Sequence, residues 1–372
     1  MRPLENLLVL DFSTLLPGPM ATLILAEAGA EVVKIERPES GDDMRGYVPR
    51  WGAESANFAL LNRGKRSIAL NLKVKADRAR LQPLLERADV LVEQFRPGVM
   101  ERLGLGYAEV AACNPRLIYC SITGYGQNGP KRDVAGHDLN YIGDTGLLAL
   151  SMGPAQSPVV PPALIADIAG GAYPAVMNIL LALLQRNLTG RGCHLDVAMT
   201  DNLFPFMYWA LGQGAATGIW PGNGTDLVTG GTPRYHLYPT ADGRIVAAAP
   251  IEDRFWRVFC DTIGLEPELR DDTRDPAATI RRIQEIIVAF PSDHWREIFA
   301  RADCCCSIMA DLQTALKDAH FQARGLFRWV LRNERNETLP ALPVPVDPAF
   351  RAAPGEALAA PPLGAHTTEY LR

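Results

Sequence analysis

The sequence predicts an α/β protein with a Rossmann-like large domain, built on a parallel sheet, and a smaller α+β domain. Short apolar runs alternate with helix-forming segments through the first hundred residues, which is typical of a parallel sheet with helical crossovers. The chain has 372 residues, and a single core stops growing at about 250–300 residues, so the length favours two domains. A glycine-dense stretch at residues 212–232 marks the change in composition between them.

The elements of the large domain follow from the apolar pattern. Strands are predicted at residues 7–10, 31–36, 89–93, 117–122 and 194–199, and helices at residues 21–28, 77–87 and 168–186. Connections between parallel strands of one sheet are right-handed, so these segments are expected to build one layered sheet.

The domain boundaries are predicted from composition. The large domain is assigned to residues 1–211 completed by 325–372, the linker to 212–232, and the small domain to 233–324. In the small domain, the Asp242-Gly243 turn between two apolar runs predicts a hairpin. Helices are expected after it at 253–263, 280–290 and 294–302.

The charge and composition are those of a soluble enzyme and argue against a nucleic-acid-binding protein. The 37 basic and 42 acidic side chains give a formal charge of −5, and the 48% of hydrophobic residues is ordinary for a soluble enzyme. Because the basic residues form no large cluster, the balance argues against a nucleic-acid partner. A small ligand that carries phosphate needs only a few local arginines or lysines.

The most apolar stretch, residues 164–184, is long enough to suggest a membrane span. It contains Asp167, Pro174 and Asn178, so a buried helix is the favoured interpretation and no membrane partner is expected. The first residues are too short and too charged for a signal peptide, and the last four are no peroxisomal address. A cytoplasmic location is the expectation.

The seven cysteines have no paired ligand spacing, so they are expected to be reduced, mostly buried thiols. The run Cys304-Cys305-Cys306 cannot place adjacent thiolates around one ion. Core packing is favoured for it, and no metal site is predicted.

Cationic side chains follow several of the predicted strands. Arg37, Arg96 and the segment Asn62–Arg66 stand in such loops, where ligands bind in open α/β sheets. Arginine binds phosphate through paired hydrogen bonds, so a nucleotide phosphate is one interpretation and solvated surface charge is the other. The first turn has one glycine, Gly18, where a dinucleotide fingerprint needs three, which argues against an NAD site.

Asp167 stands among apolar and very small side chains. It is either the N-cap of a helix that begins at Ile168 or a catalytic carboxylate, and both roles are compatible. Ala169, Gly170 and Gly171 are expected to leave space above the helix N-terminus, where free N–H groups hold an oxyanion.

His137 lies in a polar stretch ahead of a helix-like segment. It is either an ordinary loop histidine or a proton-transfer group whose tautomer is fixed by Asp138 and Asn140. Glu252 stands at a strand–helix junction, where an acidic residue is favoured by the helix dipole alone.

Taken together, these segments resemble the family III CoA-transferase superfamily, which includes the alpha-methylacyl-CoA racemases. The likeness covers nearly the whole chain. Its motifs are Leu16-Pro17-Gly18-Pro19, residues 28–38, residues 62–67, Glu93-Gln94-Phe95-Arg96-Pro97-Gly98, residues 123–130 and Thr189-Gly190-Arg191-Gly192.

The resemblance implies a CoA thioester held by the large domain. Arg37, Lys65 and Arg96 match phosphate-contacting positions, and Asn62 and Gly136 stand in matched motifs as further binding candidates. It also implies an interlocked homodimer. Coenzyme A would be part of the substrate, and no redox or metal cofactor is expected.

Within the superfamily, two chemistries are open. The segment Gly136–Tyr141 resembles the racemase motif that supplies one catalytic base, and Glu252 matches an acid near the site. Asp167 matches the second base of racemases and also the carboxylate that becomes acylated in transferases. Residues 62–71 and 363–367 are more similar to the transferases. Family sequences have Val-Thr-Pro after a cysteine where this chain has Cys306-Ser307-Ile308 or a close shift of it, which puts the packing of the small domain in question.

The leading hypothesis is 1,1-proton transfer at the carbon α to a CoA thioester, with His137 and Asp167 on opposite faces and Glu252 nearby. The alternative is transfer of CoA between carboxylic acids through an acylated Asp167. A third hypothesis is a protein that binds acyl-CoA without catalysis.

Overall fold

The structure, a computed structural model, describes residues 2–154, 156–355 and 358–371. Contacts divide the chain into two compact units. The first comprises Met1–Asp144, Ala163–Pro205 and Ala319–Arg372, and the second comprises Thr145–Pro162 and Phe206–Asp318.

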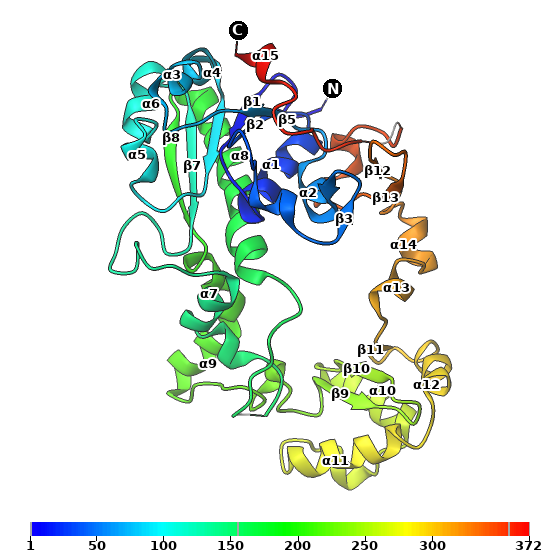
Figure 1. Ribbon diagram of the computed structural model, residues 1–372. Coiled ribbons are helices and arrows are strands. Elements are labelled where there is room, and N and C mark those ends of the chain that lie inside the picture. Colours follow the sequence, from blue (N-terminus) through cyan, green and yellow to red (C-terminus); the bar gives the residue numbers. More distant parts are fainter. Residues whose placement is uncertain (1, 155, 356–357, 372) are drawn as a thin grey trace. The chain divides into compact units, whose positions relative to one another are not determined.

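The first unit is built on a six-stranded sheet in the order β5-β2-β1-β6-β7-β8 (Figure 1). The strands are β1 (Leu8–Asp11), β2 (Glu31–Glu36), β5 (Arg66–Ala69), β6 (Val90–Glu93), β7 (Ile118–Thr123) and β8 (Cys193–Ala198). All neighbouring pairs are parallel, which confirms the predicted α/β class with a parallel sheet. Five of the strands lie within one residue of their predicted positions, and β5 was not predicted.

The first unit also contains ten α-helices among its described residues. They are α1 (Pro17–Glu27), α2 (Ala56–Asn62), α3 (Lys75–Ala79), α4 (Gln82–Arg87), α5 (Val99–Arg102), α6 (Tyr107–Cys113), α7 (Asp138–Asp144), α8 (Tyr173–Thr189), α14 (Ala319–Ala323) and α15 (Thr367–Tyr370). Two short hairpins accompany them: β3 (Arg50–Trp51) with β4 (Glu54–Ser55), and β12 (Val330–Arg332) with β13 (Thr338–Pro340).

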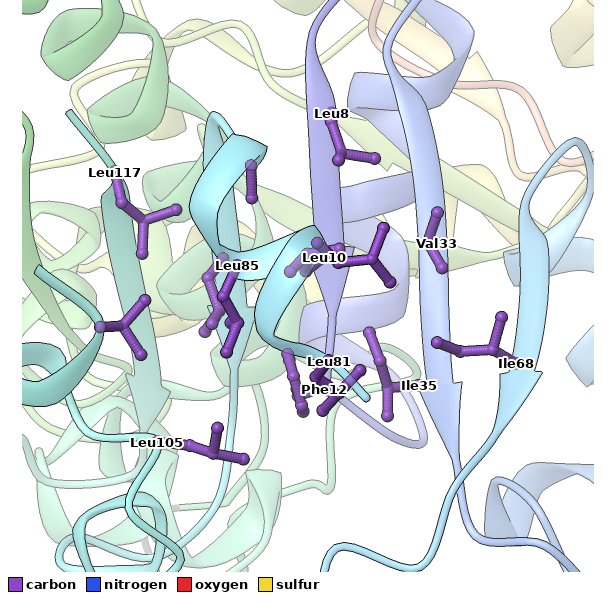
Figure 2. Packing of buried hydrophobic residues seen from close by; sticks show 14 of the residues in the cluster. Leu8, Leu10, Phe12, Val33, Ile35, Ile68, Leu81, Leu85, Leu105 and Leu117 are labelled. Carbon is purple, nitrogen blue, oxygen red and sulfur yellow. The ribbon is translucent and has the colours of Figure 1, made fainter. Parts of the chain in front are cut away.

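The core lies on both faces of the sheet. On one face, Leu8, Leu10 and Phe12 of the first strand and its extension pack against leucines from the α4 region, such as Leu81 and Leu85 (Figure 2). The other face carries α1, which contacts β1, β2 and β6, and α8, which contacts β7 and β8. Successive strand side chains alternate between faces, and every residue of β1, β6 and β7 is buried, so these strands are covered on both sides, as in other parallel sheets.

The C-terminal segment returns to the first unit and lies along β5. The amide of His366 donates to Ser67 O at 2.9 Å, and the amide of Ala69 donates to the Thr367 hydroxyl at 3.0 Å. The carboxylate of Glu27 binds two buried guanidinium groups, those of Arg63 at 2.6 Å and Arg351 at 2.7 Å. These contacts tie residues near both ends of the chain together.

The second unit holds a three-stranded antiparallel sheet, β9 (His236–Pro239), β10 (Ile245–Ala248) and β11 (Cys306–Ile308), with β10 in the middle. Its helices are α9 (Tyr208–Thr217), α10 (Asp253–Ile263), α11 (Pro276–Ile287), α12 (Ser292–Phe299) and α13 (Leu312–Ala315). Aromatic residues such as Trp256, Phe259 and Trp295 form its core with aliphatic ones. The hairpin and the α10 bounds agree with the predicted positions.

The predicted linker at 212–232 is wrong as a separate segment. Its first part belongs to α9, which continues through Gly212 and Gly214 to Thr217, and the whole stretch lies within the second unit. Residues 145–162 also belong to the second unit, although composition assigned them to the large domain. Glycine content marks backbone freedom, but packing of the neighbouring apolar side chains decides whether a helix forms.

The long apolar helix, Ala166–Thr189, has the length and composition of a membrane span, and 44% of its most apolar window is buried. The sequence favoured a buried helix here, but more than half of this window is not buried within the chain. Met177, Leu181, Leu184 and Leu188 are all exposed in the chain as described. They are spaced at four, three and four residues, so they form one apolar stripe along α8.

A network of buried ions closes the carboxyl end of the sheet. Asp11, the last residue of β1, accepts hydrogen bonds from the hydroxyl of Thr22 at 2.7 Å and from Lys65 Nζ at 3.1 Å. Burial alone would raise the pKa of Asp11, but the Lys34 and Lys65 ammonium groups and two hydroxyls hold the pKa well below its usual range. Burial lowers the pKa of Lys65 to about 8, against the effect of Asp11.

Lys34 extends this network to the loop after β1. Its Nζ donates to Ser13 O at 2.7 Å and lies 2.9 Å from Asp42 Oδ2. The other oxygen of Asp42 accepts the amide of Leu15 at 3.0 Å. The loop between β1 and α1 is therefore bound by Lys34 and Asp42, two charged side chains that are fully buried.

We predict that Asp11→Asn lowers the free energy of unfolding by about 3–5 kcal/mol, because it leaves buried ammonium groups without their counter-charge. Urea unfolding measures the change. Asp43→Asn is the control, because it removes an ion pair with Arg37 that is exposed on both sides, and such pairs contribute under about 1 kcal/mol. Equal effects of the two substitutions would contradict the role given to the buried network.

Candidate active site

A cavity of about 480 Å³ lies at the carboxyl ends of four neighbouring strands. Thr14 follows β1, Gln94 to Pro97 follow β6, Thr123 ends β7 and Met199 follows β8, and all of them line it. The chain leaves β1 toward β2 on one side and β6 toward β7 on the other, so the strand order reverses here. Such a reversal opens a crevice between the loops, which is where open α/β sheets bind ligands.

His137 and Asp167, which are 30 residues apart in the sequence, line this same cavity. His137 is exposed and immediately precedes α7, and its carbonyl accepts the amides of Asn140 at 2.8 Å and Tyr141 at 3.2 Å. Its backbone position is therefore fixed by the start of the helix.

The expected fixing of the His137 tautomer by its neighbours is not what the structure shows. The side chain of Asn140 accepts the backbone amide of His137 at 3.0 Å. The buried carboxylate of Asp138 accepts the backbone amide of Asp167 at 3.0 Å. Both side chains are short and lie beside the backbone, so they support the two catalytic candidates through main-chain groups rather than through the ring.

Asp167 lies in the first turn of a π-helix, Ala166–Ala172 (η3), which continues into α8. The N-cap interpretation is therefore wrong, because the helix has already begun at Ile165. The π-helical turn is a rare element that occurs frequently at functional sites. The carboxyl group is partly buried and reaches the cavity.

The expected oxyanion site above this helix is also corrected. The amide of Ile168 donates to Leu164 O at 3.1 Å, and that of Asp167 is bound by Asp138, so these donors are already used. A side chain at Gly170 would come within 2.5 Å of the Met199 carbonyl oxygen. The small residues thus permit close packing against the loop after β8.

Burial is the main cause that raises the pKa of Asp167 to about 7, and the negative charge of Asp138 adds to it. A carboxyl group with that pKa is half protonated near neutral pH, so it both accepts and donates protons there. Burial and the charge of Asp167 also raise the pKa of Tyr141, whose ring lines the same cavity.

Gly136 lines the cavity and is required by the packing of Tyr141. The Tyr141 hydroxyl donates to Gly136 O at 2.6 Å, and a side chain at position 136 would come within 2.7 Å of the tyrosine ring. The structure thus gives Gly136 a steric reason to be glycine beside the candidate His137.

Cations and one amide complete the lining. Arg96 is exposed after β6, and Arg132, from the loop before α7, lines the same cavity. The side chain of Gln94 accepts the amide of Gly18 at 2.9 Å and donates to Thr14 O at 2.5 Å. Sequence reasoning assigned no role to Gln94, although its place in the Glu93–Gly98 motif was a signal.

A second cavity, of about 600 Å³, lies beside the first, and Thr14 and Phe95 line both. Its wall is formed by the loops after β2 and β5, and the cations on it are Arg37 and Lys73. Arg37 pairs with Asp43. Lys73 was missed in the sequence, because the strand that it follows was not predicted.

Lys65 and Asn62 do not lie where the phosphate interpretation requires. The Lys65 side chain is fully buried and donates to Asp11 and, at 2.9 Å, to Asn62 Oδ1. The Asn62 amide group donates to Phe58 O at 3.0 Å. Arg63 is also buried, on Glu27, so this cationic segment holds the fold together instead of forming a phosphate cradle.

Glu252 belongs to the second unit. It is exposed and precedes α10 as its N-cap, with an extended backbone and no side-chain capping bond to the helix. Its matched role near the site stays a prediction. Within residues 2–154, 156–355 and 358–371, no three His, Cys, Asp or Glu side chains are grouped so as to hold one metal ion.

Comparison with known proteins identifies the family. The sequence model of CoA-transferase family III matches residues 4–367. The chain belongs to this family. Its large domain is therefore the α/β domain of a family III protein, and the resemblance drawn from the motifs is confirmed.

Curated family III relatives include both kinds of enzyme. Acetyl-CoA:oxalate CoA-transferase of Acetobacter aceti is 35% identical over 87% of this chain and 85% of its own length. Alpha-methylacyl-CoA racemase of Mus musculus is 33% identical over 99% of this chain and 92% of its own. This chain is thus an enzyme of CoA substrates, either a racemase or a CoA-transferase.

Solved structures agree with the fold. The crystal structure of a CAIB/BAIF family protein from Brucella suis superposes with a TM-score of 0.83 and 27% sequence identity, and covers 99% of this chain and 98% of that one. The architecture described here is therefore that of the family.

We predict that Asp138→Asn lowers the pKa of Asp167, because the substitution removes a negative charge while the amide oxygen still accepts the Asp167 N–H. In the unchanged chain, Asp167 should titrate near pH 7. A titration of protein labelled with ¹³C in the aspartate carboxyl groups measures both values, and Asp167→Asn assigns the signal. An Asp167 that titrates near pH 4 in the unchanged chain would contradict the raised pKa.

Proposed function

We propose that this enzyme catalyses 1,1-proton transfer at the carbon α to the carbonyl of a CoA thioester. The observation that carries the proposal is that His137 and Asp167 line one cavity and that the pKa of Asp167 is raised to about 7. Proton transfer is most efficient when the pKa of the catalytic group is close to the working pH.

The proposed reaction needs two proton-transfer groups. The thioester carbonyl makes the neighbouring C–H acidic, because the carbanion is delocalised as an enolate. One group removes the proton from one face, and the conjugate acid of the other returns a proton to the opposite face. His137 and Asp167 exchange these roles according to the epimer that is bound, so each turnover leaves them ready for the reverse reaction.

The adjoining cavities support a site for the CoA part of the substrate. Arg37 and Lys73 stand on the second cavity and Arg96 on the first, and Thr14 and Phe95 connect the two. We propose that these three cations bind the phosphate groups and that the thioester lies near Asp167. Lys73 takes the place that sequence reasoning gave to Lys65.

The second candidate is CoA transfer between carboxylic acids. It is favoured by the oxalate and glutarate CoA-transferases among the relatives and by the accessible carboxyl group of Asp167. The carboxylate would attack the donor thioester and release CoA, which gives an anhydride between Asp167 and the donor acid. CoA would then attack the Asp167 carbonyl and release the donor carboxylate. The acceptor carboxylate would take CoA from the resulting enzyme-bound thioester by the same two steps in reverse. In this chemistry His137 is a pocket residue.

We also propose that the enzyme is a cytoplasmic homodimer. The exposed stripe of α8, from Met177 to Leu188, supports an interface, because contiguous apolar surface of this kind marks contact sites. Light scattering measures the mass in solution.

We predict that His137→Ala abolishes racemisation of a 2-methylacyl-CoA, with a loss of about 10²–10⁴-fold, because one of the two faces loses its proton-transfer group. Exchange of the α-proton in D₂O should persist for the epimer whose proton faces Asp167. Asp167→Asn should stop both racemisation and CoA transfer, since the amide is neither base nor nucleophile. The measurement is deuterium uptake and epimer ratio, with and without a free carboxylic acid.

His294→Ala is the control, because it removes an imidazole stacked on Phe290 in the second unit; it should keep near wild-type activity. Near wild-type racemisation by His137→Ala would contradict the assignment of His137 and Asp167 as the two proton-transfer groups. Acceptor-dependent CoA transfer without deuterium uptake would establish the second candidate. Binding without either reaction would leave an acyl-CoA-binding protein.

We predict that Arg96→Ala weakens CoA binding about tenfold or more and makes it less sensitive to salt, since a charge-assisted contact contributes about 1.5–3 kcal/mol. Calorimetry at two salt concentrations measures both effects. Arg66→Ala is the matched control, because Arg66 lies outside both cavities and contacts His366. Unchanged affinity for CoA would remove Arg96 from the site.

A further inference from the structure

The three consecutive cysteines of the second unit occupy different environments. Cys304 is buried, Cys305 is exposed, and Cys306, the first residue of β11, is partly exposed. All three are free thiols. Cys305 is thus the most exposed of the three thiols, and Cys304 and Cys306 are the more buried ones on either side of it.

Cys305 holds its two neighbours in a tight bend. Its φ of +52° lies in the left-handed region, which is rare for residues other than glycine. Its carbonyl accepts the amide of Ala249 at 3.0 Å, and Cys306 is paired with Ala248 in the sheet. The bend is thus anchored by β10 and the residue after it.

This bend brings the flanking residues within reach of a covalent link. Helical backbone places the Cα atoms of residues two apart at about 5.5 Å, whereas extended backbone separates them by about 7 Å. Disulfides need a Cα–Cα distance of about 4.4–6.8 Å. With the residue between them in the left-handed region, two cysteines can therefore reach the Cα–Cα distance of a disulfide, whereas in a regular strand their Cα atoms are too far apart.

The Cys306 thiol is turned back toward residue 304. The Cys306 thiol donates to Cys304 O at 3.3 Å. A hydrogen bond from the Cys306 thiol also lowers the pKa of Cys304, and that bond together with burial raises the pKa of Cys306. The two thiols therefore interact, and Cys306 is the one of the pair that solvent reaches.

We propose that Cys304 and Cys306 are a redox-reactive pair that hydrogen peroxide converts into an intramolecular disulfide. One of the two thiols, as its thiolate, attacks one peroxide oxygen, the O–O bond breaks, and the hydroxide that leaves takes up a proton to become water. The sulfur is left as a sulfenic acid. The other thiol then attacks that sulfur, the S–S bond forms, and a second water leaves.

Overall, two thiols and one peroxide give one disulfide and two waters. The closed ring is small, and strained disulfides are the more easily reduced ones, so a thiol reductant is expected to reverse the reaction. The link would fix the corner at which Cys305 contacts Ala249, three residues before Glu252. The chemistry does not depend on the proposed function.

The experiment treats the full chain with hydrogen peroxide and then alkylates the remaining thiols. Cleavage after Arg301 and Lys317 gives one peptide, residues 302–317, that contains all three cysteines. We expect this peptide to lose two hydrogens and to carry one alkyl group, located on Cys305 by fragmentation. Dithiothreitol should restore three alkylation sites.

Cys305→Ser is the matched control and should still form the link, whereas Cys306→Ser, which removes one of the two sulfurs, cannot form it. Because Cys304 is in the core, Cys304→Ala and Cys304→Ser are compared, and circular dichroism checks their fold. A bond that includes Cys305, three alkylated thiols after peroxide, or oxidation to sulfinic acid alone would overturn the proposal.

Discussion

The buried contacts of Asp11 with Lys34 and Lys65 hold the edge of the sheet on which the site is built. Three side chains that carry charge are removed from water at the carboxyl ends of β1, β2 and the segment before β5. Removing such groups from water is costly, so the arrangement persists only because each charge has a partner and each remaining donor has an acceptor. Lys34 and Asp42 transmit this order to the loop from Ser13 to Leu15. Thr14, which lines both cavities, stands on that loop.

The candidate catalytic groups depend in turn on backbone contacts between elements distant in the sequence. Asp138 starts α7 and binds the amide of Asp167 at the start of the π-helix, so the element that carries His137 is attached to the one that carries Asp167. The same carboxylate also raises the pKa of Asp167 by its charge. One side chain therefore both positions the second group and adjusts its protonation.

The sequence predicted the sheet well because the strands of a parallel sheet are short, continuous apolar runs. The strand β5 was missed, because Arg66-Ser67-Ile68-Ala69 has only one large apolar residue and gains its burial from α15 and the C-terminal segment. Lys65 was wrongly predicted to contact phosphate for a related reason. The local sequence around a loop lysine does not show whether its side chain is solvated or buried against an aspartate 54 positions away.

The motifs predicted Asp167 and His137 as site residues without any knowledge of the packing, and the structure places both residues on one cavity. The reasons given for them failed where packing decided. Gly170 is small because a carbonyl group after β8 approaches it, and Asn140 is used by a backbone amide instead of the imidazole ring. Contacts between elements this far apart leave no local pattern in the sequence.

A carboxyl group with a pKa near 7 serves either chemistry of the family. As a nucleophile it must be ionised, and as one of two bases it must be ionised for one epimer and protonated for the other, so a half-protonated group meets both needs near neutral pH. The fold and Asp167 therefore do not separate racemase from transferase, which agrees with relatives of both kinds at 33–35% identity. What separates them is a second proton-transfer group in the same cavity. In the proposed function His137 is that group: it is held at the start of α7 by its own carbonyl and amide, and it lines the same cavity as Asp167.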